Sequence, residues 1–172
     1  MKKTLLIIAG ALAGLVAIMW IIGVLLPAGH TATRMARFAQ PPEAVWEAIT
    51  NSAGMTAWRS GLQEVRPLDG GKAGWMEVSD FGELPLEIVE QDPPRRLVMR
   101  IADENLPFGG TWTYVVAPRD GGGSTLRITE DGVIHSAFFR FMARFFFGHT
   151  ATIETYLTDL GKKFGETVTP VE

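Results

Sequence analysis

An unbroken hydrophobic run opens the chain, with no charged residue from Thr4 to Leu26. A helix of ~23 residues rises ~1.5 Å per residue and therefore spans the ~30 Å hydrocarbon layer of a bilayer. Pro27 and Gly29 follow the run and end it. The pattern predicts a transmembrane anchor in residues 1–29, through which residues 4–26 cross the membrane, and a separate domain in residues 30–172.

A cleaved signal peptide is the alternative for this segment. Its hydrophobic region is typically ~7–15 residues long, and small residues mark the cleavage site. The run here is longer, and Pro, Leu or His occupy positions between Pro27 and Ala32 where small residues would be needed. These differences favour an anchor. Lys2 and Lys3 favour an N-terminus inside and a domain outside the cytoplasm, although Arg34 and Arg37 on the far side weaken that bias.

The anchor contains one small-residue pair, Gly10 and Gly14. Small residues four positions apart let two membrane helices approach closely, so this pair could support a dimer. The alternative is that glycine and alanine are simply common in membrane helices. The sequence leaves both explanations open.

Beyond the anchor, hydrophobic and polar residues alternate in short runs that Gly and Pro separate. TATRMARF predicts a first strand, PPEAVWEAITN a helix with Pro42 in its first turn, and AGMTAW a second short helix. Six further strands are indicated by LQEVRPL, GWMEVSD, LPLEIVEQD, RRLVMRIA, GTWTYVVAP and STLRITEDG. Their short connections are typical of an antiparallel meander.

The hydrophobic period changes to steps of three or four from Ser136 to about Phe164. The repeating positions are Phe138, Met142, Phe145, His149, Ile153, Tyr156, Leu160 and Phe164. They predict a long amphipathic helix, which Gly148 can kink or divide. This helix is the one element large enough to cover the apolar face of the sheet, so the fold class is α+β.

The order of these elements, with AW at 57–58, DPPRRLVMRI, STLRITEDG and FGHTATIETYLTDLGKKFG, resembles the START-like helix-grip superfamily (SRPBCC). Within it, the chain is most similar to polyketide cyclase/dehydrase-type members over roughly residues 31–166. The resemblance implies a curved antiparallel sheet wrapped on the long C-terminal helix, with an elongated apolar cavity between them. It also implies a hydrophobic ligand, such as a lipid, sterol or polyketide, and in a minority of members a reaction on that ligand.

Strand alternation then indicates which residues would face such a cavity. The predicted ligand-cavity residues are Trp75, Met99, Ile101, Trp112, Tyr114, Ile128 and Glu130 from the strands and Phe141, Phe145, His149 and Tyr156 from the helix. The alternative is an ordinary core, because cavity and core use the same residue types. Buried Trp and Tyr side chains need polar partners, which favours the cavity for the aromatic members.

Three residues are candidates for acid–base chemistry: Glu130, His149 and Tyr114. A carboxyl group on the inner face would be desolvated, and its raised pKa would suit proton transfer. Alternatively, Glu130 lies at the wet end of its strand and pairs with Arg127 or Arg100. His149 would become a catalytic candidate through a hydrogen bond to Glu130, and otherwise is a core or boundary residue.

Composition excludes several other classes of site. Lys2 and Lys3 belong to the anchor, so the domain contains 14 of the 16 basic residues and 19 acidic residues. The basic residues form no cluster in the sequence that could bind the phosphates of a nucleic acid. The chain has no cysteine, and its three histidines are widely separated, so we expect no metal site. No dinucleotide, phosphate-loop or nucleophile-elbow motif occurs, and no cofactor is expected.

The segment FFRFMARFFFGHT, residues 138–150, concentrates aromatic residues beside two arginines. One sheet cannot cover rings that point in several directions around a helix. Phe139 and Phe146, with Arg140 and Arg144, are therefore predicted to contact the membrane interface. The alternative is that these rings pack under the loop 103–109 or against the first short helices.

Together these patterns predict a membrane-tethered binding or carrier domain for a hydrophobic small molecule or lipid. One alternative is a cyclase- or dehydratase-like enzyme that uses general acid–base catalysis on a hydrophobic substrate. Another is a protein–protein interaction module at the membrane.

Overall fold

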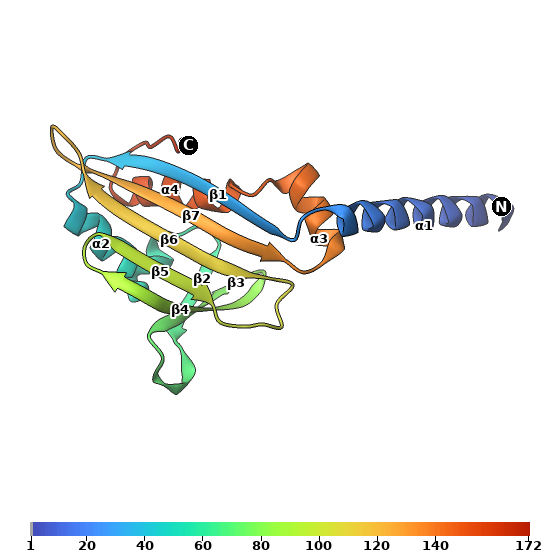
Figure 1. Ribbon diagram of the computed structural model, residues 1–172, viewed down its shortest axis with the longest axis horizontal. Helices are drawn as coiled ribbons and strands as arrows, with labels where there is room; N and C mark the ends of the chain where they lie inside the picture. The colour runs from blue at the N-terminus through green and yellow to red at the C-terminus, as the bar shows by residue number, and fades with distance from the viewer. Residues whose placement is uncertain (1) are drawn as a thin grey trace.

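The computed structural model describes residues 2–172, and its most prominent feature is a helix that projects from the domain (Figure 1). This helix, α1, covers Lys2–Leu25, and its most apolar 18-residue window has a mean hydropathy of 2.7. It is long and apolar enough to cross a membrane, as the sequence predicted. Only three residues separate α1 from strand β1 (Gly29–Phe38).

One seven-stranded antiparallel sheet forms the body of the domain (Figure 1). Its strands are β1, β2 (Leu62–Pro67), β3 (Gly74–Ser79), β4 (Gly82–Asp92), β5 (Arg96–Ile101), β6 (Phe108–Pro118) and β7 (Ser124–Ile134). The order is β1-β7-β6-β5-β4-β3-β2. Consecutive strands from β2 to β7 are therefore neighbours, which confirms the predicted meander, and β1 closes the order by pairing with β7.

Short helices fill the connection between β1 and β2. Helix α2 (Pro42–Thr50) has Pro42 in its first turn and buries Val45, Ala48 and Ile49. A 3₁₀ helix, η1 (Ser52–Ala57), follows and buries Met55. A second 3₁₀ turn, η2 (Asp69–Gly71), links β2 to β3. The fixed φ of proline suits a helix start, and the apolar spacing of α2 aims one face at the sheet.

The C-terminal helical region is divided into separate pieces. Helix α3 (Ala137–Met142) continues as a π-helical turn, η3 (Ala143–Phe147), and α4 (Ala151–Lys163) begins after a break. Gly148 lies at the break with φ 72° and ψ 177°, a conformation that glycine adopts without steric cost. The predicted division at Gly148 is therefore confirmed, and the apolar positions from 138 to 147 do not continue the face that α4 presents to the sheet.

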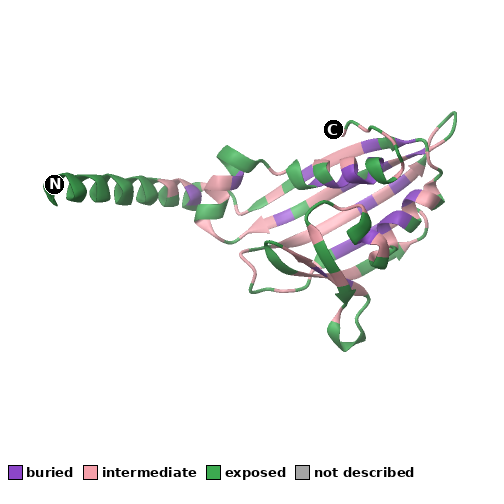
Figure 2. Ribbon diagram, turned by 180° about the vertical axis from the view of Figure 1, so that it is seen from behind, coloured by how far each residue is buried: buried purple, intermediate pink, exposed green. Residues whose placement is uncertain are grey.

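Only the second piece, α4, lies on the sheet. It buries Ile153, Tyr156, Leu157 and Leu160 against strand residues such as Leu126. Figure 2 shows the buried positions along α4 and the strands beneath it. Burying each such aliphatic side chain contributes about 1.5–3 kcal/mol, so this contact fixes α4 on the sheet.

Helix α3 instead joins α1 to the domain. Gly23 of α1 is buried against it, and a Cβ atom at Gly23 would lie 1.9 Å from the carbonyl oxygen of Ala137. The guanidinium of Arg140 donates to the carbonyls of Gly23 (3.4 Å) and Leu26 (3.2 Å) and to those of Ile134 (2.9 Å) and His135 (3.0 Å). The last carbonyls of a helix lack partners within it and attract cations, so Arg140 caps α1 and ties it to the domain.

Candidate ligand-binding site

The concave face of the sheet carries the strand residues that were predicted to line a cavity. Met99 lies opposite Trp112, and Trp112 lies opposite Glu130 in the next strand. One row along, Tyr114 lies opposite Ile128. Because side chains two residues apart share a face, these rows place all five side chains together under α4.

Aromatic rings from three elements meet above this face. The ring of Tyr156, from α4, lies 5.3 Å from Trp58, 6.2 Å from Trp112 and 5.7 Å from Tyr114, between ring centroids. Trp58 follows η1 and was not among the predicted lining residues. The four rings form an apolar wall at the centre of the space between sheet and helix.

A largely buried ion pair, which no pattern in the sequence indicated, lies next to these rings. Arg59 pairs with Glu77, which also accepts a hydrogen bond of 3.1 Å from the indole of Trp75. The guanidinium carbon of Arg59 lies 5.0 Å from the centre of the Tyr156 ring. Burial is the largest single effect and would lower the pKa of Arg59, but the charge and hydrogen bond of Glu77, together with Tyr156 and Tyr114, outweigh it and raise that pKa. The pair therefore holds a permanent charge at the edge of an aromatic cluster.

The two buried tyrosines bring hydroxyl groups to the same place. Burial raises the pKa of Tyr114 and of Tyr156, so both hydroxyls stay protonated. Their rings lie 5.7 Å apart, between centroids. A protonated phenol can donate a hydrogen bond to a ligand or to water.

A pocket of about 270 Å³ opens beside the ion pair, between the end of η1 and α4. Its lining is Arg59, Ser60, Ala151, Thr152, Thr155, Tyr156 and Asp159. A second pocket, about 180 Å³, lies between α2, η1 and the end of α4. Sites for drug-sized ligands usually measure about 300–1,000 Å³, so α4 must shift before a large ligand enters the first pocket.

Asp159 fixes the pocket wall by connecting α4 to the segment after η1. Its carboxylate accepts hydrogen bonds from the backbone N–H of Ser60 (2.8 Å), the hydroxyl of Ser60 (2.5 Å) and the ammonium of Lys162 (2.8 Å). Burial by itself would raise the pKa of Asp159, but these donors outweigh burial and lower that pKa. The ionised carboxylate is thus the form that holds the wall together.

Acid should therefore weaken this connection. Because the pKa of Asp159 is lower in the folded state, its contribution is complete above the ordinary carboxyl pKa of about 4 and is lost as the pH falls through the lowered value. We expect the difference in unfolding free energy between the wild type and Asp159→Asn to shrink between pH 6 and pH 3 in urea titrations. The matched control is Glu64→Gln, at an exposed position of β2. A constant difference across this range would contradict the assignment.

A second polar cluster lies at the end of the sheet where β1 begins. His30 Nε2 is 3.2 Å from Glu130 Oε1, and the ring of His149 stacks on His30 at 4.1 Å. The hydrogen bond that would have made His149 a catalytic candidate is absent, because His30 occupies that side of Glu130. Among the described residues, the buried Nδ1 atom of His30 has no partner.

Burial shapes the titration of this cluster. It raises the pKa of Glu130 despite the opposing effect of His30 and of a hydrogen bond from Trp112. It lowers the pKa of His149, with help from the charges of His30 and Arg144. Arg127 and Arg100, the alternative partners for Glu130, lie elsewhere, since Arg100 pairs with Glu87 and Arg127 faces Met35. His30 is therefore the partner of Glu130 that the sequence did not indicate.

Two helix residues predicted for the cavity lie outside it. The Phe145 side chain is 57% exposed on η3, and its ring packs on Phe141 at a centroid distance of 4.9 Å. Both residues precede the break at Gly148, which directs their segment away from the sheet. Arg140 also differs from its predicted role, because its donors are used by backbone carbonyls. Phe139, Phe146 and Arg144 are exposed.

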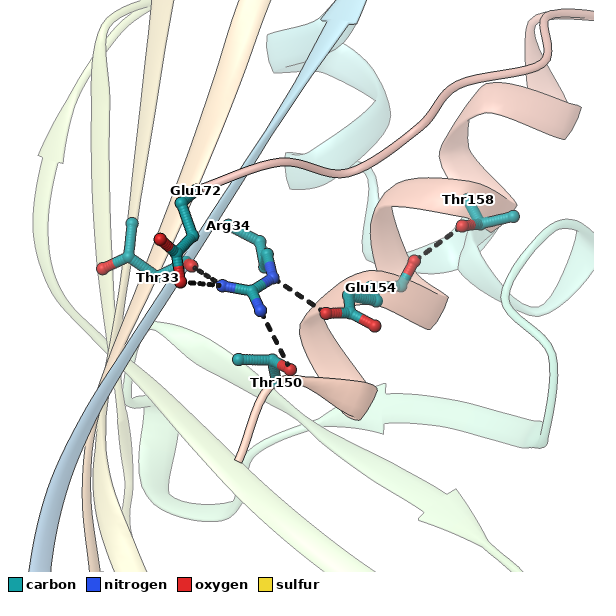
Figure 3. A network of polar contacts seen from close by, with 6 residues as sticks. All are labelled: Thr33, Arg34, Thr150, Glu154, Thr158 and Glu172. Atoms are coloured by element: carbon teal, nitrogen blue, oxygen red, sulfur yellow. Dashed lines mark hydrogen bonds and ion pairs between the residues drawn. The ribbon is translucent and has the colours of Figure 1, made fainter. Parts of the chain in front are cut away.

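A network around Arg34 holds the start of α4 over the sheet (Figure 3). Arg34 donates to Glu154 Oε1 at 2.8 Å, to Thr150 Oγ1 at 3.5 Å and to the carbonyl of Thr33 at 2.9 Å. Its guanidinium also lies 3.6 Å from the carboxylate of Glu172. The hydrogen bond from Arg34 lowers the pKa of Glu154. This network has a structural role. By holding Thr150, it also positions the preceding residue, His149.

Solved structures with the same fold extend across most of the chain. A conserved protein from Geobacillus kaustophilus matches with a TM-score of 0.64 and 12% identity, covering 82% of this chain and 100% of its own. A START superfamily protein from Mycobacterium smegmatis matches with a TM-score of 0.63 and 11% identity, covering 78% and 96%. A norcoclaurine synthase from Thalictrum matches with a TM-score of 0.61 and 9% identity, covering 78% and 93%. At these identities the likeness shows the fold alone.

Sequence comparison gives the family. No curated protein sequence matches the chain. A family described as polyketide cyclase/dehydrase and lipid transport matches residues 30–162. This description, together with the START-type fold, supports a domain that binds a hydrophobic ligand. The match covers most of the chain, which therefore belongs to the polyketide cyclase/dehydrase and lipid transport family.

Proposed function

We propose that the protein is a membrane-tethered binding or carrier domain for a hydrophobic small molecule or lipid. The observation that carries the proposal is the aromatic wall of Trp58, Trp112, Tyr114 and Tyr156, which lies over the sheet beside a charged pocket. The charge bias of Lys2 and Lys3 supports placing this domain outside the cytoplasm.

The arrangement suits a ligand with an apolar body and a polar end. Rings and aliphatic side chains of the concave face would contact the body, where contact area gives most of the affinity. Arg59 and the hydroxyls of Tyr114 and Tyr156 would hydrogen-bond the polar end. Entry requires α4 to move outward. The break at Gly148 separates α4 from the helix before it, so this movement must open the contacts of Arg34 with Thr150 and Glu154.

A pocket-filling variant tests this proposal on the full-length chain purified in detergent. Thr155 is exposed on α4 and lines the 270 Å³ pocket, so Thr155→Trp fills the pocket without disturbing the core. We expect wild-type protein to retain apolar molecules that mass spectrometry detects after extraction, and to take up a fluorescent fatty-acyl analogue. The variant should bind that analogue at least ~10-fold more weakly, which corresponds to ~1.4 kcal/mol.

The control for this experiment is Asp120→Trp, at an exposed position of the β6–β7 turn. It adds the same ring at a distance from the pocket and should bind as the wild type does. The proposal fails if wild-type protein neither carries an apolar molecule nor takes up the analogue. Equal affinities for wild type and Thr155→Trp would move the binding site away from this pocket.

A further inference from the structure

The strand directions bring several distant segments to one end of the sheet. Strand β1 begins at this end, directly after α1, and β7 ends there beside it. Because every neighbouring pair is antiparallel, the β3–β4 turn and the β5–β6 loop lie at the same end. The segment formed by α3 and η3 also lies there, packed on the last turn of α1 (Figure 1). The opposite end carries the β4–β5 and β6–β7 turns.

Exposed phenylalanines gather at this end. Within residues 2–172, those with exposed side chains are Phe81, Phe108, Phe138, Phe139, Phe145, Phe146 and Phe147, which we call the phenylalanine rim. Phe81 is fully exposed in the β3–β4 turn, and Phe108 starts β6. The turns of the opposite end, 93–95 and 119–123, contain no aromatic residue. Exposed apolar patches of this kind mark interaction surfaces.

The occupant of this surface follows from the anchor. Three residues separate α1 from β1, so the corner of this end where β1 begins lies within about 10 Å of the last turn of α1. The β3–β4 turn lies four strand spacings, about 19 Å, across the same end of the sheet. The contact of Gly23 with Ala137 and the hydrogen bonds of Arg140 hold α3 against that turn. If α1 crosses a bilayer, the rim is thus held at the surface of the same bilayer.

The charges at this end indicate how the rim would bind. Between Asp131 and Glu154 the chain has no acidic residue, and Arg144 is exposed. Acidic residues do flank the other rim segments, including Asp80 beside Phe81 and Asp103 and Glu104 in the β5–β6 loop. This mixture gives no strong attraction to anionic headgroups. Ring insertion at the boundary of the acyl chains, where amphipathic surfaces bind, is the mode that fits.

We infer that the domain rests on the bilayer that α1 spans, with the phenylalanine rim inserted at the interface. The inference rests on the proposed tether and adds the orientation of the domain. It places the His30–Glu130 end of the concave face next to lipid. A hydrophobic molecule could then pass between bilayer and domain without crossing water.

Single cysteines can test this orientation, because the chain contains none of its own. Full-length protein with Phe81→Cys or Phe146→Cys would carry a nitroxide label in phosphatidylcholine nanodiscs. Phe81 is fully exposed, so its replacement removes no packing. We expect both labels to collide more often with oxygen than with a water-soluble nickel complex. A label at Asp120→Cys, in the turn at the opposite end, should show the reverse preference.

The result that overturns the inference is a label at position 81 that is as accessible to nickel as the label at 120. A lipid-facing label at 146 with an aqueous label at 81 would also overturn it, because the domain would then not rest on its sheet end. A label at Leu12→Cys reports separately whether α1 lies in the bilayer. The two proposals can fail separately. If the label at position 81 faces lipid but the protein binds no apolar ligand, the proposed carrier function is rejected and the contact of the domain with the bilayer is retained.

Discussion

Replacing Glu77 with alanine should lower the free energy of unfolding by about 3 kcal/mol, because Arg59 would remain as a buried cation without its partner. Arg59 cannot lose its proton at neutral pH to relieve this cost. The indole of Trp75 would lose its acceptor as well. Urea titrations of the full-length protein in detergent, followed by tryptophan fluorescence, measure the loss.

An exposed ion pair provides the control for that experiment. Glu87 and Arg100 pair across β4 and β5 on the surface, so Glu87→Ala should leave the unfolding midpoint close to the wild-type value. A double variant, Glu77→Ala with Arg59→Met, removes both charges and should recover much of the lost stability. Equal losses for Glu77→Ala and Glu87→Ala would show that Arg59 reaches water after all.

Adding one methyl group at Gly23 should separate the anchor from the domain. The new Cβ atom would lie 1.9 Å from the carbonyl oxygen of Ala137, far inside contact distance, so α1 and α3 must move apart. The hydrogen bonds from Arg140 to Gly23 and Leu26 are already 3.4 and 3.2 Å long and would break. The domain would then rotate about residues 26–28.

Distance measurements between spin labels at Leu15→Cys and Asp120→Cys detect this change. We expect one narrow distribution of label-to-label distances in the otherwise unchanged protein. With Gly23→Ala the distance distribution should be at least about twice as wide, because the backbone of residues 26–28 then moves freely. Gly14→Ala is the matched control, since no atom lies within 4 Å of a Cβ atom at that position. If Gly23→Ala and Gly14→Ala give the same width, α3 does not fix the anchor.

The sheet was predictable because its signal is local. Alternation along STLRITEDG and GTWTYVVAP places Ile128, Trp112 and Tyr114 on the inner face, and the ladder registers agree. The uncharged run likewise required only length and composition to indicate α1. The division of the last helix was harder, because Phe138 and Phe145 continue the same spacing as Ile153 and Tyr156. Gly148 indicated a kink or a division between them, and its backbone conformation decides for the division.

The polar contacts were not predictable, because they join residues that are far apart in the chain. Arg59 reaches Glu77 across a turn and two strands, and His30 reaches Glu130 through the pairing of the first strand with the last. Arg140 was read as a membrane contact, yet it caps a helix that ends more than 100 residues earlier. A charged residue has no periodic pattern that identifies its partner, so tertiary structure alone assigns these pairs.

The joint at Gly23 also fixes the direction in which the rest of α1 faces. At about 100° per residue, Gly10 and Gly14 lie on nearly the opposite side of the helix from Gly23. Within residues 2–172, a Cβ atom at either position would have no neighbour within 4 Å outside its own stretch of helix. If two copies associate through this pair of glycines, their domains will point away from each other across the two-fold axis. Each concave face would then serve its own patch of membrane, and neither would block the other.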